Sequence, residues 1–317
     1  MSVRSPLRRH ALFSSGLVRG GRGGGSFWLL LFAFFAASLQ AVPLSFTDDS
    51  GTTLIFTTPP RRIISLAPNL TELAYAAGLA DKLVAVTAYS DYPPEAKKLP
   101  LMGDAFRLDW ERLLALQPDL VLGWQSGLSA RDRAMFSKLG LRLLVLEPRH
   151  LEDIPKALRL LGQVGGTGEV AEASAREFER QRDGLRLQYA ARAPMRAYFQ
   201  IADTPLLTVN GDHIISDVLR LCGAENVFTA APLLTPTIST EALLTARPEV
   251  LLALAVSPRQ MEDVLRTWRL LPLPAVKQQH YGFFEPDLMS RASPRILQGA
   301  TAVCSQIDAA RRTFSRQ

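Results

Sequence analysis

One twelve-residue motif occurs twice in the chain, at Glu111–Leu122 and again at Glu241–Leu252. The two copies align without a gap, lie 130 residues apart and are identical at five of their twelve positions. Each copy has the pattern of a helix, a proline turn and a buried apolar strand, which is the order of elements in α/β proteins. Chance recurrence of a common pattern is the alternative. We interpret the repeat as a sign of two related α/β segments.

The sequence around both copies supports this interpretation. Strand and helix patterns alternate in each half, which predicts parallel sheets with helical crossovers. The first half is expected to begin with a hairpin (44–46 and 53–56) and to continue with strands at 61–66, 83–87, 120–124 and 142–146 and helices at 69–77, 110–116 and 131–139. The second half is expected to contain strands at 196–201, 250–254 and 281–284 and helices at 214–221, 240–246, 258–267 and 294–310.

A long helix is predicted between the two halves, from Thr167 to Ala191. Thr167 is a usable N-cap, apolar residues recur at helical spacing, and Pro194 ends the pattern. On the polar side, Glu172 can pair with Arg176, and Glu179 with Arg182. At about 1.5 Å per residue this helix would be roughly 36 Å long. It could pack on its own domain, but we favour a strut between two lobes.

The first 41 residues have the pattern of a signal peptide. Basic residues and a glycine-rich run precede the apolar block 27–37, and small residues follow it. The apolar block is short for a membrane span, so an anchor is the less favoured alternative. Arg8 and Arg9 leave both the general secretory and the twin-arginine routes open.

The leader accounts for five positive charges (Arg4, Arg8, Arg9, Arg19 and Arg22), and without it 31 basic residues face 30 acidic ones. Nothing in this balance suggests a nucleic-acid partner.

The expected boundaries are therefore a signal peptide at 1–41, an N-terminal lobe at 42–152, linking helices at 153–193 and a C-terminal lobe at 194–317. The predicted fold class is α/β, with two Rossmann-like lobes joined by one long backbone helix.

Cys222 and Cys304 both follow the leader, and one cysteine pair in an exported protein is most simply a disulfide. Related lobes that face a cleft are suited to binding a ligand.

Motifs for enzyme catalysis are not found. The segment 123–127 places its serine wrongly for a nucleophile elbow, and 165–168 lacks the lysine of a phosphate loop. His150, His213 and His280 are widely spaced, so we expect neither a catalytic histidine network nor a metal site. The sequence favours a binding protein without a cofactor over an enzyme.

Five segments resemble the periplasmic vitamin B12-binding proteins of cobalamin ABC importers, a branch of the helix-linked substrate-binding proteins. These segments are 61–72, 89–94, the first copy of the repeated motif at 111–121, 222–228 and 291–296. The first and third are shared with siderophore and haem receptors, while the others are more specific. The resemblance implies two lobes on one backbone helix, small hinge motion, and delivery of cobalamin as a transported ligand from the periplasm to a dimeric permease by a monomeric receptor.

The resemblance also implies roles for single residues. Tyr89, Asp287 and Arg291 match ligand-contacting positions, and Trp124 is our own addition as an aromatic face. Glu111 and Glu241 match the glutamates that such receptors present to arginine pockets of the two permease subunits. Several cleft aromatics of the family are replaced here, at Ala105 or Phe106, Ile201, Thr235 and Leu288. Haem or a ferric siderophore is therefore an alternative ligand, and an exported two-lobed enzyme is the alternative of another class.

Overall fold

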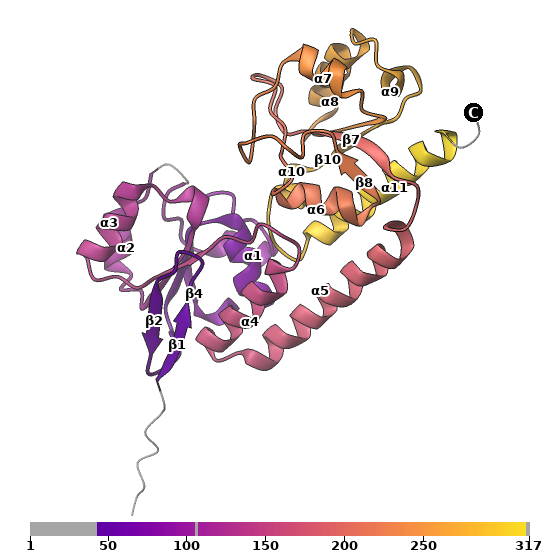
Figure 1. Ribbon diagram of the computed structural model, residues 1–317. Coiled ribbons are helices and arrows are strands. Elements are labelled where there is room, and N and C mark those ends of the chain that lie inside the picture. The colour runs from indigo at the N-terminus through magenta and orange to yellow at the C-terminus, as the bar shows by residue number, and fades with distance from the viewer. Residues whose placement is uncertain (1–42, 105–106, 315–317) are drawn as a thin grey trace, which may run out of the picture. The chain divides into compact units, whose positions relative to one another are not determined.

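The computed structural model describes residues 43–104 and 107–314 (Figure 1). The predicted signal peptide, and Ala105 and Phe106 among the replaced cleft aromatics, lie outside these ranges. No helix within the described ranges is long and apolar enough to cross a membrane.

The N-terminal lobe is built around a four-stranded parallel sheet. Its strands are β3 (Ile63–Ser65), β4 (Leu83–Val86), β5 (Leu120–Trp124) and β6 (Leu143–Leu146), in the spatial order β4-β3-β5-β6. Helices α1 (Pro68–Ala76), α2 (Trp110–Ala115) and α3 (Ala130–Lys138) connect them, together with short 3-10 turns at Ala80–Lys82, Pro94–Lys98 and Gln125–Gly127. The predicted hairpin of β1 (Leu44–Thr47) and β2 (Thr53–Phe56) precedes this sheet as a separate antiparallel pair.

The C-terminal lobe repeats this topology. Its parallel sheet contains β7 (Met195–Gln200), β8 (Ala224–Asn226), β9 (Val250–Leu254) and β10 (Tyr281–Phe284), in the order β10-β9-β7-β8. The helices are α6 (Ile214–Leu221), α7 (Thr240–Ala246), α8 (Pro258–Arg269), α9 (Pro274–Lys277), α10 (Pro286–Met289) and α11 (Ile296–Phe314). Strands β3, β4, β5 and β6 correspond in chain order to β7, β8, β9 and β10. With this correspondence, the strand order is the same in both sheets. Strand β8 and the short helices α9 and α10 had no clear signal in the sequence.

The repeated motif has equivalent contacts in the two lobes. Asp119 accepts hydrogen bonds from the backbone N–H groups of Arg61 and Arg62, just before β3. Glu249 accepts one from the backbone N–H of Arg196, within β7. The side chain of Arg62 donates to the carbonyl of Leu116 at the end of α2. In the same way, the side chain of Arg196 donates to the carbonyl of Ala246 at the end of α7. These shared contacts support duplication over chance recurrence.

Two helices lead from the first sheet to the second. Helix α4 (Asp153–Gly165) packs against α5 (Gly168–Tyr189), and α5 also contacts α1, α6 and α11 (Figure 1). A close approach of α4 and α5 requires Gly162, where an added Cβ would lie 2.2 Å from the Ala171 Cβ. One continuous apolar core runs from the N-terminal lobe through α4 and α5 into the C-terminal lobe, and separate smaller cores cover the other face of each sheet.

Of the details predicted for the long helix, the N-cap position of Thr167 is confirmed and the pair of Glu179 with Arg182 is wrong. Thr167 does occupy the N-cap position, but its hydroxyl donates to the carbonyl of Ala77 in the N-terminal lobe instead of capping α5. Glu179 binds Arg159 of α4, at 2.7 Å, and not Arg182, which pairs with Glu152 and Asp183. Both side chains make tertiary contacts that helical spacing cannot show. The predicted pair of Glu172 with Arg176 is present at 2.7 Å.

The predicted disulfide joins Cys222 and Cys304. Cys222 follows α6, Cys304 lies in α11, and both are fully buried in the main core. The bond closes a loop of 82 residues, so the chain-entropy model gives it about 4 kcal/mol of stabilisation. It fixes the last helix of the C-terminal lobe against α6.

Candidate functional site

The carboxyl ends of parallel strands lie at one edge of a sheet, and ligands of open α/β sheets bind there. In the N-terminal lobe this edge is organised by three buried hydroxyls. Thr71 of α1 donates to Ser65 at the end of β3 and lies 3.1 Å from the Ser90 hydroxyl. The turn after β4 is thereby held against α1. It projects Tyr89, which has a φ of 66° and a side chain that is 79% exposed.

Trp124, the second aromatic residue of the predicted site, ends β5. Its side chain is partly buried and packs against the main core, and an added Cβ on Gly127 would lie 2.9 Å from its ring. One part of the indole is therefore core, while the rest lines a pocket between the lobes. Tyr89 and Trp124 differ in this respect, since most of Tyr89 is exposed.

Asp287 and Arg291, both predicted to contact the ligand, lie next to each other. Asp287 lies in α10, and its carboxylate is 2.8 Å from Nη2 of Arg291, which follows the end of that helix. The side chain of Arg291 is only 10% exposed and points away from solvent. Its Nη1 donates to Glu72 at 2.9 Å and to Asp91 at 2.8 Å, both in the N-terminal lobe. Arg291 is thus surrounded by three carboxylates from the two lobes.

Glu72 is the centre of this contact between the lobes. The carboxylate, in α1, is 2% exposed. In addition to Arg291, it accepts hydrogen bonds from the Ser293 hydroxyl at 2.5 Å and from Nη1 of Arg295 at 3.0 Å. All three donors come from the short segment between α10 and α11. Such a buried and fully paired carboxylate holds its partners in fixed positions, and its removal is costly.

Electrostatic interactions keep Arg291 and Asp91 charged. Burial alone would lower the pKa of Arg291, but hydrogen bonds to Asp91 and Glu72 outweigh it and the pKa is raised. Desolvation alone would raise the pKa of Asp91, but the hydrogen bond and the charge of Arg291 outweigh it, so the pKa is lowered. Arg291 and Asp91 therefore remain an ion pair throughout the physiological range.

A pocket of about 280 Å³ lies beside Arg291, between the carboxyl edges of the two sheets. The N-terminal lobe contributes Asn69, Trp124, Glu147, Pro148 and Arg149, and the C-terminal lobe contributes Ile201, Asp212, His213, Ile214, Ile215, Leu234, Leu254, Ser290 and Ala292. We call this the interlobe pocket. Its volume is near the lower limit for ligand pockets, so a large ligand would also need the exposed surfaces around it.

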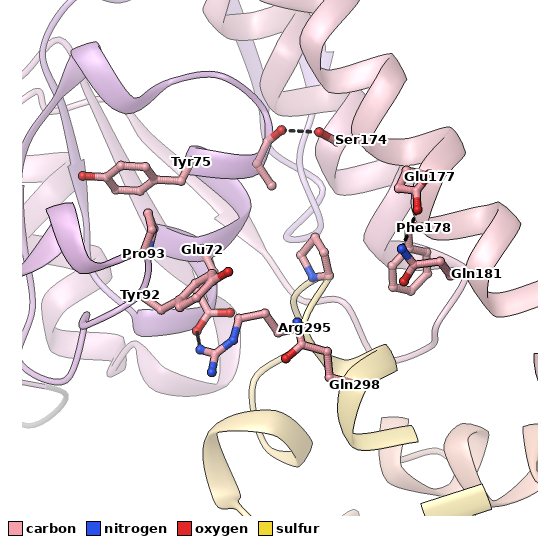
Figure 2. A pocket seen from close by; sticks show the side chains of 12 residues that line it. Glu72, Tyr75, Tyr92, Pro93, Ser174, Glu177, Phe178, Gln181, Arg295 and Gln298 are labelled. Carbon is pink, nitrogen blue, oxygen red and sulfur yellow. Dashed lines mark hydrogen bonds and ion pairs between the residues drawn. The ribbon is translucent and has the colours of Figure 1, made fainter. Parts of the chain in front are cut away.

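A second pocket, of about 410 Å³, lies where α1, α5 and the start of α11 meet (Figure 2). Figure 2 shows Arg295 reaching from the C-terminal lobe toward Glu72, with the Tyr92 ring beside it. The Arg295 guanidinium lies 3.9 Å from the centre of that ring, a cation–π contact. Tyr75, Phe178 and Gln298 also line this pocket, but none of the four predicted ligand residues does.

The replaced cleft aromatics have different locations. Ile201 lines the interlobe pocket, Thr235 is exposed, and Leu288 is partly buried in α10. Exposed apolar side chains are nevertheless present after the strands of the C-terminal lobe, at Leu233 and Val256. Sequence reasoning missed both, because isolated apolar residues in loops give no periodic signal.

Glu111 and Glu241 occupy equivalent and exposed positions. Glu111 lies in the first turn of α2, capped by Asp109, and Glu241 lies in the first turn of α7, capped by Ser239. The pKa of Glu241 is lowered by hydrogen bonds from its own backbone N–H and from Ser239. A negative charge at these positions is favoured by the helix dipole in any case.

The histidines have structural partners. His150 contacts Asp217 at 3.0 Å, and His213 caps α6, where burial lowers its pKa to about 4. The described ranges contain no group of three side chains suited to holding a metal ion.

Comparison with known families identifies the fold. The family model described as periplasmic binding protein matches residues 63–284, which is most of the chain from β3 to the end of β10. This chain belongs to the periplasmic binding protein family.

Relatives of this periplasmic binding protein share both sequence and fold with it. The vitamin B12-binding protein of Yersinia pestis (strain Pestoides F) is 38% identical over 249 residues, covering 78% of this chain and 86% of the relative. The crystal structure of the periplasmic vitamin B12 binding protein BtuF of Vibrio cholerae matches with a TM-score of 0.73 at 34% identity, over 80% of this chain and 98% of BtuF. The periplasmic heme binding protein HutB of Vibrio cholerae matches with a TM-score of 0.67 at 20% identity, over 78% of this chain and 98% of HutB, a likeness of fold alone.

The comparisons confirm the resemblance to vitamin B12-binding proteins and the α/β fold class with two lobes joined by a backbone helix. They also place the chain among binding proteins and not among enzymes. Glu72, Asp91 and Arg295 lie in segments that resemble the vitamin B12-binding proteins, but no role was predicted for them. A signal existed for Glu72, since it is a charged residue within the apolar run of α1.

Proposed function

We propose that this protein is the periplasmic substrate-binding component of an ABC importer, which captures vitamin B12 or a related corrinoid and delivers it to a membrane permease. The observation that carries the proposal is the 38% identity to the Yersinia vitamin B12-binding protein over 86% of that relative. The haem-binding neighbours are 20 to 24% identical and support haem less, because at that level the likeness concerns the fold.

The predicted ligand residues suit a corrin. A corrin is a large, mostly apolar plate fringed with amides, so its receptor needs aromatic faces and a few hydrogen-bonding groups. Tyr89 and Trp124 offer the faces, while Asp287 offers a polar group from the other lobe and is held in place by Arg291. Leu233 and Val256, both exposed, can add apolar area. We propose that the ligand lies over the interlobe pocket between these residues.

Titration with cyanocobalamin, dicyanocobinamide and haemin tests the ligand class. We expect both corrinoids to bind with micromolar or tighter affinity, which corresponds to at least about 8 kcal/mol, and haemin to bind more weakly. If neither corrinoid binds at micromolar concentration, the proposal is wrong. Chemical turnover of any of the three would favour an enzyme instead.

We further propose that Glu111 and Glu241 dock the receptor onto a dimeric permease, one glutamate on each subunit. Both are exposed at equivalent helix starts of the duplicated lobes. Arginine–carboxylate bonds suit such docking, because they are specific in geometry and weaken with salt, which lets the receptor leave. The alternative role is stabilisation of the helix start alone, worth about 0.3–1 kcal/mol.

The double variant Glu111→Ala/Glu241→Ala separates these roles. We expect unchanged corrinoid affinity and nearly unchanged melting temperature, with loss of transport in cells. Glu169→Ala is the matched control, because Glu169 is also exposed in the first turn of a helix but lies on α5. Intact transport in the double variant with a lowered melting temperature would leave only the stabilising role.

The periplasmic location and the monomeric state are parts of the same proposal. We expect the leader to be removed between about Ala37 and Ala41, so the mature protein should lack the apolar block 27–37. Intact mass of protein purified from the periplasm checks the cleavage, and a mass that still includes this block would contradict it.

A further inference from the structure

Charged side chains from both lobes form one cluster around Arg291. Arg291 is a buried cation that binds Asp287 and, in the other lobe, Asp91 and Glu72, and these three carboxylates lie 2.8 to 2.9 Å from its guanidinium. Arg295 adds a second positive charge, paired with Glu72. Two guanidiniums thus face three carboxylates, which leaves one net negative charge in the cluster.

Only two of these carboxylates reach solvent. Glu72 is 2% exposed, whereas Asp91 is 42% and Asp287 is 46% exposed. Asp91 follows Tyr89 by two residues in the N-terminal lobe, and Asp287 lies in α10 of the C-terminal lobe. Because Asp91 binds Nη1 and Asp287 binds Nη2 of the same guanidinium, the two partly exposed carboxylates lie near each other. Lys97 also interacts with Asp91, but it is exposed to solvent and screened.

An ionised carboxylate can only accept hydrogen bonds. A pair of them recognises N–H donors, such as the primary amides at the rim of a corrin, and repels carboxylates at the rim of another tetrapyrrole. Haem carries propionate carboxylates at its edge, so it meets like charge here. The sequence suggested Arg291 as a polar contact for the ligand, but its guanidinium is already shared among three carboxylates.

We propose that Asp91 and Asp287, held together by Arg291, form a charge filter that selects amide-fringed corrinoids over carboxylate-fringed tetrapyrroles. This inference rests on the proposed function and adds to it the basis of selection. Asp91 is thereby a specificity-determining residue. Glu72 acts indirectly, because it positions Arg291 between the two aspartates.

Dicyanocobinamide and dicyanocobyrinic acid are the matched probes, because they share the corrin ring and differ in having amides or carboxylates at its rim. The test variant is Asp91→Asn/Asp287→Asn, since asparagine keeps the shape and can still accept a hydrogen bond from Arg291. We expect the variant to bind cobinamide about tenfold more weakly and cobyrinic acid about tenfold more tightly than the wild type does. Opposite shifts of this kind cannot arise from a loss of folded protein.

The control variant is Asp183→Asn/Asp263→Asn, which changes the net charge equally at two exposed aspartates of α5 and α8. It should leave the affinity ratio of the two probes unchanged. Equal ratios in the wild type and the test variant, or the same shift in the control, would overturn the filter while the proposed function stands. Failure of the wild type to bind cobinamide at all would overturn both.

Discussion

At the scale of single residues, Glu72 joins the two lobes. Its carboxylate accepts hydrogen bonds from Arg291, Ser293 and Arg295, all of which belong to the other lobe. Removing one partner of a buried ion pair leaves the other charge without compensation, which costs several kcal/mol. The segment between α10 and α11 is therefore held to α1 mainly by this one side chain.

We predict that Glu72→Gln lowers the free energy of unfolding by about 3 kcal/mol, because two buried guanidiniums lose one negative charge. Urea denaturation measures the change, and Glu169→Gln on the exposed face of α5 serves as the control. A change below about 0.5 kcal/mol, the usual range for surface substitutions, would show that Glu72 does not hold the lobes together.

Some residue roles could be read from the sequence and some could not. The disulfide partners were predictable because only two cysteines follow the leader. The partners of Glu72 and Asp91 were not, since they lie more than 190 residues away and no periodicity connects them. Trp124 illustrates an intermediate case, because the end of a strand can belong both to the core and to a pocket.

At the scale of elements, the packing of α4 on α5 depends on small residues. An added Cβ on Gly162 would lie 2.2 Å from the Ala171 Cβ, whereas nothing lies within 4 Å of such an atom on Gly184. Both glycines are inside helices, so alanine would improve the intrinsic helix propensity at either position by about 1 kcal/mol. The difference between them is steric.

Gly162→Ala and Gly184→Ala should therefore change stability in opposite directions. We expect Gly162→Ala to lower the free energy of unfolding by about 1–3 kcal/mol, the usual cost of overpacking. Gly184→Ala should raise it by about 0.5–1 kcal/mol. Parallel denaturant titrations compare the two variants, and changes of the same sign would contradict the close contact between α4 and α5.

The stabilisation that Glu172 of α5 gives to the folded protein depends on pH. Hydrogen bonds from Arg159 and Arg176 lower the pKa of this carboxyl to about 2 from 4.5. A lowered pKa in the folded protein means that the stabilisation is fully present above about pH 4.5 and is lost as the pH falls through 2.

We predict that Glu172→Gln lowers the melting temperature at pH 7, and that the difference from the wild type shrinks steadily below pH 4.5. Thermal melts at pH 7, 4 and 3 follow this change. A difference that is the same at pH 7 and pH 3 would mean that the ion pairs with Arg159 and Arg176 do not contribute.

Element types were predictable because hydrophobic periodicity and turn residues are local. Helix α5 was expected from Thr167 to Ala191 and extends from Gly168 to Tyr189. Strand β8, with only three residues, carries too little pattern to be recognised, and its pairing with β7 arises from tertiary structure.

At the scale of the whole molecule, duplication explains the fold. The same strand order, the same contacts of Asp119 and Glu249, and the same positive φ at Gln117 and Arg247 recur in the two lobes. The sequence repeat was sufficient to predict this. It could not predict the charge cluster at the interlobe contact, because Glu72 and Arg291 belong to different lobes and have no counterpart in the repeated motif.

We propose above that a corrinoid binds between the lobes beside Arg291. Cobalamin contains cobalt, so anomalous X-ray scattering from a crystal grown with cyanocobalamin locates the ligand directly. We predict one cobalt site per chain, over the interlobe pocket and within reach of Tyr89 and Asp287. Absence of cobalt from the protein, or a site in the pocket formed by α1, α5 and α11, would contradict it.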